Sequence, residues 1–418
     1  MTAPDPAPTA SPARTVIDAA GPAFLASAYA GRLPAAMNQL GLLLVVSAAG
    51  RGLALAGSSV AAVGLGTAAL AAVIGRLVDR HGPLPVLAVA VLAQTAGLGT
   101  VLLALARDLP DAVVLAGAAL TGAANPQVPS VARATWSRIG RSSDPARGAR
   151  AVRLGLGYET AADETSFVIG PVAAGGLVSL LGAEGAALAL IVLTAVGEGL
   201  FALWLLGNPA LARPEHRGGA RTAETAPAGA TALRAVSSAR PGAPVAALLT
   251  TILAIGLVFG VTQTALTAVN ASRGTPGLTG PVYGCMGLTS GILGLVSAGI
   301  RLSVPGRLAL GGAAVALGSL VLMSVPGTGP TVVVMLVMGA GVGLTLATCY
   351  TALEVLAPTG RVTALMTMGA TANVLGVSAG SVLTGLIGTD LHRGNAPGVV
   401  AGAAVLVASL ALCRARRP

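Results

Sequence analysis

The chain has 418 residues, of which 54% are hydrophobic and 10% are charged, and its formal net charge at pH 7 is +10. Soluble domains contain about 25% charged residues, so this composition excludes an ordinary soluble globular protein. A helical membrane protein fits, because the apolar residues come in long blocks and the alternating pattern of a β-barrel is absent.

Twelve apolar blocks are each close to the roughly 20 residues that cross a bilayer as a helix. Helices are the expected spanning structure, because they satisfy their own backbone hydrogen bonds in lipid. The sequence therefore predicts an all-α integral membrane protein with twelve transmembrane helices. The blocks centre near residues 35, 66, 95, 122, 167, 195, 256, 291, 316, 342, 374 and 404.

Residues 1–22 come before the first block and are rich in Pro, Ala and Thr. They lack the basic-then-apolar order of a cleaved signal peptide, and their composition favours a disordered cytoplasmic tail. The first block contains Arg32. A charged side chain at that depth is expensive, so Arg32 is a functional-site candidate.

A glycine-bounded basic turn, residues 75–82 (GRLVDRHG), joins the second and third blocks. Residues 299–306 (GIRLSVPG) occupy the equivalent place between the eighth and ninth blocks, also with Gly seven residues before Gly. This correspondence predicts two six-helix pseudo-repeats, a design in which a transporter binds its substrate at the interface near mid-membrane.

The fourth block contains the run Asn125-Pro126-Gln127-Val128-Pro129. Two prolines are expected to break the helix here, which membrane proteins tolerate where the backbone is buried or lines a cavity. Residues 136–153 follow as an expected basic loop. Trp136 and Trp204 fall at expected cytoplasmic edges, where anchoring at the interface explains them.

The fifth block carries three carboxylates, Glu159, Asp163 and Glu164, within an apolar stretch. Glu159 and Asp163 are four residues apart and therefore share a helix face, whereas Glu164 points about 100° away from Asp163. Two like charges on one face beside a cation would let one carboxylate bind a proton near neutral pH. The candidate proton-coupling residues are therefore Asp163, Glu164, Glu159 and Arg32. A static ion pair between helices is the equally weighted alternative.

The second long polar segment, residues 207–244, divides the chain into two halves. The expected organisation is a tail (1–22), an N-terminal six-helix half (23–206), a cytoplasmic linker (207–244), a C-terminal six-helix half (245–413) and a short cytoplasmic tail (414–418).

The positive charge is distributed as in a membrane protein rather than a nucleic-acid-binding protein. All 25 basic residues are Arg; Arg32 lies inside a span, and four fall in expected outer loops (Arg51, Arg107, Arg273, Arg393). The rest lie in or beside expected cytoplasmic segments, as the positive-inside rule requires. We therefore expect a multi-pass cell-membrane protein in the lipid bilayer with both termini in the cytoplasm and no nucleic-acid partner.

Twelve helices in two halves with the pattern G-x-L-x-D-R-x-G after helix 2 resemble the major facilitator superfamily. In that family this segment acts as a cytoplasmic gate. The resemblance assigns the gate to Gly75, Asp79, Arg80 and Gly82. Pro83 and Leu84 replace the usual basic pair, which weakens the electrostatic part of the gate.

The fifth helix resembles the antiporter branch of the superfamily, which carries G-x8-G-x3-G-P-x2-G-G. Four positions match and two are small-for-small replacements, while generic small-residue packing is the alternative. The matching positions are Gly157, Ser166, Gly170, Pro171, Ala174 and Gly175. The chain also resembles actinobacterial drug or metabolite:proton antiporters, through Arg32-Leu33-Pro34, Tyr158-Glu159 and Asp163-Glu164.

The depth of the charges predicts which of them pair. Arg32 lies nine residues from Ala23 and Asp163 nine residues from Leu154, on helices that run in the same direction. We therefore expect Arg32 to pair with Asp163 or Glu164. The family's buried Arg on helix 4 is replaced by Ala118, so Arg32 is expected to supply the buried cation.

The resemblance places helices 1, 4, 7 and 10 along the substrate path, although a helix–helix hydrogen bond explains each polar residue there equally well. The candidate contacts are Asn38, Gln39, Asn125, Gln127, Gln263, Asn270 and Tyr350.

The leading interpretation is a monomeric secondary transporter that exports a small organic compound, a drug or natural product, by proton antiport with alternating access. An importer of a sugar or metabolite with the same fold is the first alternative, and a non-transporting sensor or scaffold is the second. No nucleophile–base pair and no metal-ligand spacing occur, and the three cysteines are widely spaced. We therefore expect neither an enzyme nor a bound metal or cofactor.

Overall fold

The computed structural model describes residues 11–141, 144–212, 242–324, 327–357, 362–388 and 391–415. These residues form helices and no strand, which confirms the all-α class. Most of the expected linker (213–241), the first ten residues and the last three lie outside the described residues.

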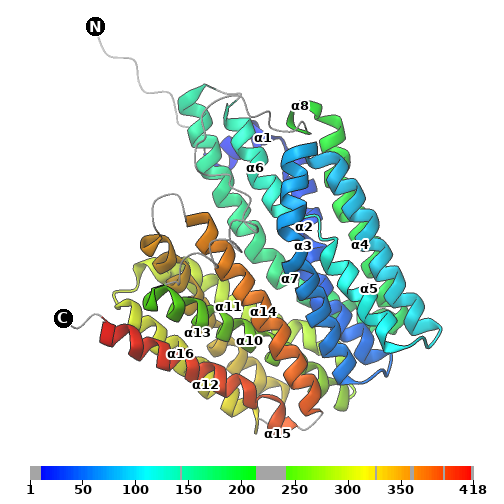
Figure 1. Cartoon of the computed structure of the whole chain (residues 1–418), viewed down its shortest axis with the longest axis vertical. Helices are drawn as coiled ribbons and strands as arrows, with labels where there is room; N and C mark the ends of the chain where they lie inside the picture. The colour runs from blue at the N-terminus through cyan, green and yellow to red at the C-terminus, as the bar shows by residue number, and fades with distance from the viewer. Residues whose placement is uncertain are drawn as a thin grey trace.

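Long helices make up most of the described chain (Figure 1). Short helices flank them: α1 (Pro12–Ala20), α8 (Pro209–Ala212), η1 (Pro276–Leu278), η2 (Ser297–Gly299) and α15 (Leu391–Gly394). The spans are α2 (Pro22–Ala48), α3 (Leu53–His81), α4 (Pro83–Ala106), the pair α5 (Asp111–Ala123) and α6 (Val128–Arg141), the two segments of α7 (Pro145–Gly207), α10 (Ala243–Ser272), α11 (Thr279–Val296), α12 (Val304–Leu322), α13 (Thr328–Leu356), α14 (Val362–Ile387) and α16 (Ala396–Ala415).

Helix α7 contains two spans, because its 63 residues are interrupted at Gly182, whose φ of 69° is left-handed. A straight helix of that length would reach about 95 Å, three times the thickness of the hydrocarbon core. Within the described residues, nine helices are long and apolar enough to cross a membrane. Counting α7 twice and adding α2 and the interrupted pair α5–α6 gives the expected twelve.

The expected break in the fourth span is confirmed. Helix α5 ends at Ala123 and α6 begins at Val128. Between them Gln127 has a φ of 56°, and its backbone N–H donates to Asn125 Oδ1 at 3.0 Å. The basic loop expected over residues 136–153 is wrong, because α6 continues to Arg141 and α7 begins at Pro145. The buried side chains of α6 recur at helical spacing, from Val128 to Ile139, and hold this segment as a helix.

The expected gating loop is a helix end rather than a loop. Gly75, Asp79 and Arg80 lie within α3, and Gly82 alone joins α3 to α4 with a φ of 86°. Pro83 then occupies the first turn of α4, where its missing N–H is tolerated. The equivalent segment 299–306 has a different conformation, with Gly299 in η2 and Gly306 inside α12.

The disordered tail expected over residues 1–22 contains a helix in its described part. Ser11 caps α1 by accepting a hydrogen bond from the Arg14 backbone N–H at 3.4 Å, and Pro12 follows at the first helical position. Val16 is buried in an apolar cluster that includes Phe24 and Trp136. The capping residue and this apolar anchor outweigh the Pro- and Ala-rich composition.

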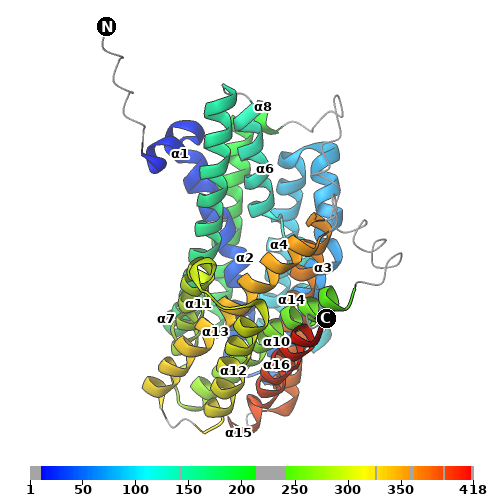
Figure 2. The same ribbon diagram turned by 90° about the vertical axis from the view of Figure 1, so that its left-hand side faces the viewer.

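The two six-helix halves meet along two pairs of helices, α3 with α14 and α7 with α11 (Figures 1 and 2). Glycines bring these backbones together. A Cβ atom added at Gly57 of α3 would overlap the Ser381 carbonyl of α14, and one added at Gly280 of α11 would overlap the Pro171 carbonyl of α7. In both views α1, α6 and α8 stand apart from the helices of the C-terminal half.

This close approach predicts that Gly280→Ala lowers stability by about 1–3 kcal/mol, the usual range for overpacking. The added methyl group can only be accommodated by moving α11 away from α7, because its neighbour is backbone. Gly294→Ala on the same helix is the matched control, since nothing lies within 4 Å of its added Cβ. Thermal unfolding of both purified variants in detergent measures the difference, and equal midpoints would contradict the close contact.

Candidate functional site

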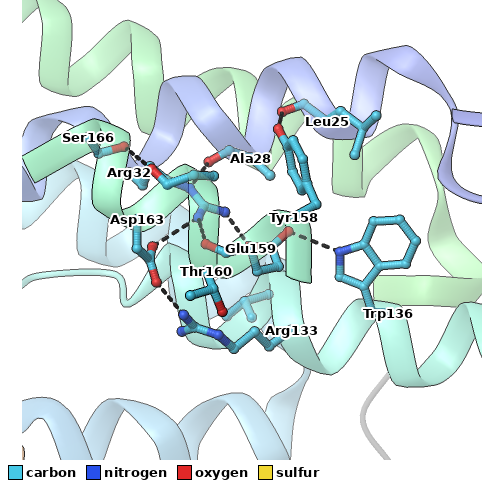
Figure 3. A network of polar contacts seen from close by, with 12 residues as sticks. Leu25, Ala28, Arg32, Arg133, Trp136, Tyr158, Glu159, Thr160, Asp163 and Ser166 are labelled. Atoms are coloured by element: carbon cyan, nitrogen blue, oxygen red, sulfur yellow. Dashed lines mark hydrogen bonds and ion pairs between the residues drawn. The ribbon is translucent and has the colours of Figure 1, made fainter. Parts of the chain in front are cut away.

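Three helices of the N-terminal half bring four charged side chains together inside the protein (Figure 3). Arg32 comes from α2, Arg133 from α6, and Glu159 and Asp163 from the first segment of α7. We call these four residues the charged network. Its two cations balance its two carboxylates, as buried charges require.

Arg32 is held by contacts at all three guanidinium nitrogens. Its Nε donates to the Ala28 carbonyl at 3.2 Å, and its Nη1 donates to Asp163 Oδ1 at 2.9 Å and to the Glu159 carbonyl at 3.1 Å. Its Nη2 forms an ion pair with Glu159 Oε2. The Arg32 side chain is 1% exposed, so it is a fixed and fully desolvated cation.

Glu159 is the enclosed carboxylate of the network, with no exposed side-chain surface. One carboxylate oxygen pairs with Arg32, and the other accepts a hydrogen bond from Trp136 Nε1 at 3.0 Å. Both oxygens therefore have charged or polar partners, and Glu159 ties α7 to α2 and α6.

Asp163 is the accessible carboxylate of the network. Oδ1 pairs with Arg32, while Oδ2 pairs with Arg133. The side chains of Asp163 and Arg133 are 22% and 40% exposed, against 1% for Arg32. Asp163 therefore links the buried part of the network to the partly exposed Arg133.

The structure confirms the expected ion pair between Arg32 and Asp163, but the alternative pairing with Glu164 is wrong. Glu164 is exposed, and its carboxylate lies against Gly291 of α11. The cause is helix geometry, since consecutive residues point about 100° apart. Glu159, which shares a face with Asp163 as expected, is the second partner of Arg32.

Arg133 and Trp136 are the two members of the site that the sequence analysis missed. The sequence predicts Arg133 at a cytoplasmic edge and Trp136 as an interface anchor, whereas the Trp136 side chain is fully buried. Both lie on α6, three residues apart, and α6 reaches the acids of α7 because the chain restarts as a helix at Val128. The fourth span, α5–α6, therefore supplies a cation after all, further along the chain than Ala118.

Removing the indole N–H of Trp136 is expected to lower the stability of the protein while leaving the charged network in place. Trp136→Phe keeps an aromatic ring against Phe24, with which Trp136 makes an edge contact at 5.5 Å between ring centroids. It leaves one oxygen of the buried Glu159 without its donor, which costs about 1–3 kcal/mol. The midpoint of thermal unfolding in detergent measures this loss, and an unchanged midpoint would show that the hydrogen bond contributes nothing.

The positions of the antiporter-like motif lie along the first segment of α7, where two of its glycines make packing contacts. Gly170 faces Ala36 of α2, and Gly175 faces Gly277 and Gly280 of the other half. The remaining positions vary: Ser166 is buried and donates to the Ala162 carbonyl at 2.7 Å, Ala174 is buried in the core, Pro171 presents its carbonyl to Gly280, and Gly157 has open space around it.

The candidate substrate contacts are spread over both halves rather than gathered at one point. Gln263 donates to Ser381 Oγ and Asn270 donates to Thr279 Oγ1, each at 3.1 Å, so both make helix–helix hydrogen bonds. The others have mixed surroundings: Asn38 is buried, Gln39 and Tyr350 are half-buried, and Asn125 and Gln127 form the break between α5 and α6. Within the described residues, no three His, Cys, Asp or Glu side chains are placed to hold a metal ion.

The sequence matches the family model described as the Major Facilitator Superfamily over residues 23–381. Comparison with curated proteins found no match. Among solved structures, the chain is similar to the nucleoside transporter NupG, with 14% identity, a TM-score of 0.65, and coverage of 98% of this chain and 100% of that one.

Two further structures resemble the chain at 14% identity. One is a bacterial homologue of the iron transporter ferroportin in an inward-facing state, with a TM-score of 0.68 and coverage of 98% of this chain and 100% of that one. The other is a bacterial homologue of the human lysosomal transporter Spinster in an inward-facing and unoccupied conformation, with a TM-score of 0.65 and coverage of 99% and 100%. Because the family model spans most of the sequence and the fold agrees over nearly its whole length, the chain belongs to the Major Facilitator Superfamily of membrane transporters.

Proposed function

We propose that the protein exports a small organic compound, a drug or natural product, in exchange for protons. The observation that carries this proposal is the position of Asp163, which bridges the buried Arg32 and the partly exposed Arg133. A carboxylate in such a place can exchange a proton with water while remaining connected to the interior of the N-terminal half.

Protonation of Asp163 would change the forces between three helices at once. The neutral acid would hold Arg32 and Arg133 less strongly, because charge-assisted hydrogen bonds are about twice as strong as neutral ones. Arg32 would keep Glu159 as its counter-ion, whereas Arg133 would be released. Proton binding would thereby loosen α6 from α7, a local change that can favour a different packing of the halves.

The arrangement of the halves supports alternating access. They meet at Gly57 near the start of α3, and at Gly175 and Gly280 of α7 and α11. With both termini in the cytoplasm, as the distribution of Arg favours, these contacts lie toward the outer side. The structure would then correspond to an inward-facing state of a monomeric transporter in the cell membrane.

The direction of transport is proposed from the antiporter-like spacing between Gly157 and Gly175 in α7. Its Gly170 and Gly175 line the contacts with α2 and with the other half. The contact of Gly175 with the other half supports a role for the motif in sliding between the halves.

The proposed function is tested by measuring whether the protein makes a sensitive bacterial host resistant to toxic compounds. Bacteria that lack their own efflux pumps would express the wild-type chain or Asp163→Asn at equal amounts and be exposed to a panel of antibiotics and natural products. We expect the wild type alone to protect against at least one compound. That compound should then accumulate in inverted membrane vesicles with an acidic lumen. Uptake into whole cells instead would identify an importer, and the absence of any compound-dependent effect would favour a sensor or scaffold.

A further inference from the structure

A second set of buried polar side chains lies inside the N-terminal half, apart from the charged network. Among the described residues, seven buried side-chain nitrogen and oxygen atoms have no hydrogen-bond partner, and six of them belong to four residues. These four residues, Asn38, Gln94, Thr194 and Glu198, are between 0% and 3% exposed. The seventh atom belongs to Thr264 of the other half. Unpartnered buried polar groups are rare, and a cluster of them indicates a site.

The packing of α2 against the second segment of α7 brings Asn38 and Thr194 to the same level. Gly41 of α2 lies against Leu190, and the two helices run in opposite directions. Asn38 is one turn before Gly41, and Thr194 is one turn after Leu190, so the two side chains share the facing surfaces. Glu198 follows Thr194 by one further turn.

The fourth member, Gln94, comes from α4 and lies beside the Glu198 carboxyl group. No hydrogen bond of ordinary geometry joins the two groups, because both Glu198 oxygens and Gln94 Oε1 remain without a partner. The cluster thus spans three helices, α2, α4 and α7.

In the part of the chain that the structure describes, no cation faces Glu198. Helix α4 carries no Asp, Glu, Lys, Arg, His, Cys or Tyr. The titratable groups on the other helices that pack against this segment have partners elsewhere or are exposed: Arg32 and Arg133 pair with the acids of the charged network, Tyr29 donates to Thr165, Arg138 donates to the Leu211 carbonyl, Arg14 and Asp18 form a surface pair, and Arg141 is exposed. An ionised carboxylate in hydrocarbon without a counter-ion is strongly unfavourable.

We propose that Glu198 is a second proton-binding site, in which the carboxyl group is a neutral acid beside Gln94. A single proton removes the charge and supplies one O–H donor, and Gln94 Oε1 on the facing helix α4 is an acceptor without a partner. The site shares no residue with the charged network, so it does not depend on a coupling role for Asp163.

Infrared spectroscopy of the purified full-length protein in lipid nanodiscs tests the proposal. The wild type should show the C=O stretch of a protonated carboxylic acid at neutral pH, and Glu198→Gln should lose it. Glu184→Gln is the matched control, because Glu184 is an exposed acid on the same segment of α7. A band that persists in Glu198→Gln would overturn the proposal. A band that appears only when Na⁺ is removed would also overturn it, in favour of a metal-ion site.

A second measurement does not depend on the folding of the variant. Dicyclohexylcarbodiimide reacts with protonated carboxyl groups in apolar surroundings, and peptide mass spectrometry locates the adduct. We expect the wild-type protein to carry the adduct at Glu198 at neutral pH. Labelling of other acids without labelling of Glu198 would contradict a neutral acid at this position.

Discussion

Arg32→Gln is expected to destabilise the protein more than any other single change in the charged network. Glu159 is fully buried and Asp163 is only partly exposed, and Arg32 is paired with both. Its loss leaves Glu159 without a counter-ion, and removing one partner of a buried pair costs about 3–5 kcal/mol. The midpoint of thermal unfolding in detergent should fall accordingly. Loss of the folded-protein peak in size-exclusion chromatography after heating measures it.

The double variant Arg32→Gln with Glu159→Gln separates the loss of an interaction from the burial of an unpaired charge. It removes one cation and one anion, and Arg133 can still neutralise Asp163. We therefore expect the double variant to be more stable than Arg32→Gln alone. If the two variants unfold at the same temperature, the unpaired Glu159 charge is not the cause of the destabilisation.

Asp163→Asn is expected to leave folded protein in the membrane and to reduce export to the level of the empty host. Asparagine keeps the size of the side chain and can still accept a hydrogen bond from Arg32, but it cannot bind and release a proton. Export of the compound identified with the resistant host would be measured in cells that contain equal amounts of each variant.

Glu164→Gln is the matched control for this experiment. Glu164 is the next residue along α7 and is also an acid, but it faces α11 and takes no part in the ion pairs of the charged network. We expect it to retain export. Equal loss in both variants would indicate that any change of charge in this part of α7 disturbs transport.

The sequence was sufficient to predict the features that depend on regular helix geometry. Long apolar blocks predicted the spans, and two prolines predicted the break before Val128. Equal depth predicted that Arg32 pairs with Asp163 or Glu164, and Asp163 is the partner. Depth could be calculated because each residue of a helix advances by a fixed rise.

Other features depend on contacts between elements, which sequence spacing does not encode. Arg133 and Trp136 lie in a polar, amphipathic stretch that resembles a surface loop. Only the direction of α6 after the break brings Arg133 to Asp163 and Trp136 to Glu159. Likewise, the match between residues 75–82 and 299–306 did not predict local conformation, since Gly82 is left-handed and Gly306 is helical.

Proton movement in reconstituted vesicles tests the central claim, that Asp163 couples proton binding to export. Proteoliposomes would enclose a pH-sensitive dye, and the transported compound would be added outside in the presence of a proton gradient. The account predicts a compound-dependent change of internal pH with the wild type and none with an equal amount of folded Asp163→Asn. An undiminished proton flux in Asp163→Asn would contradict it.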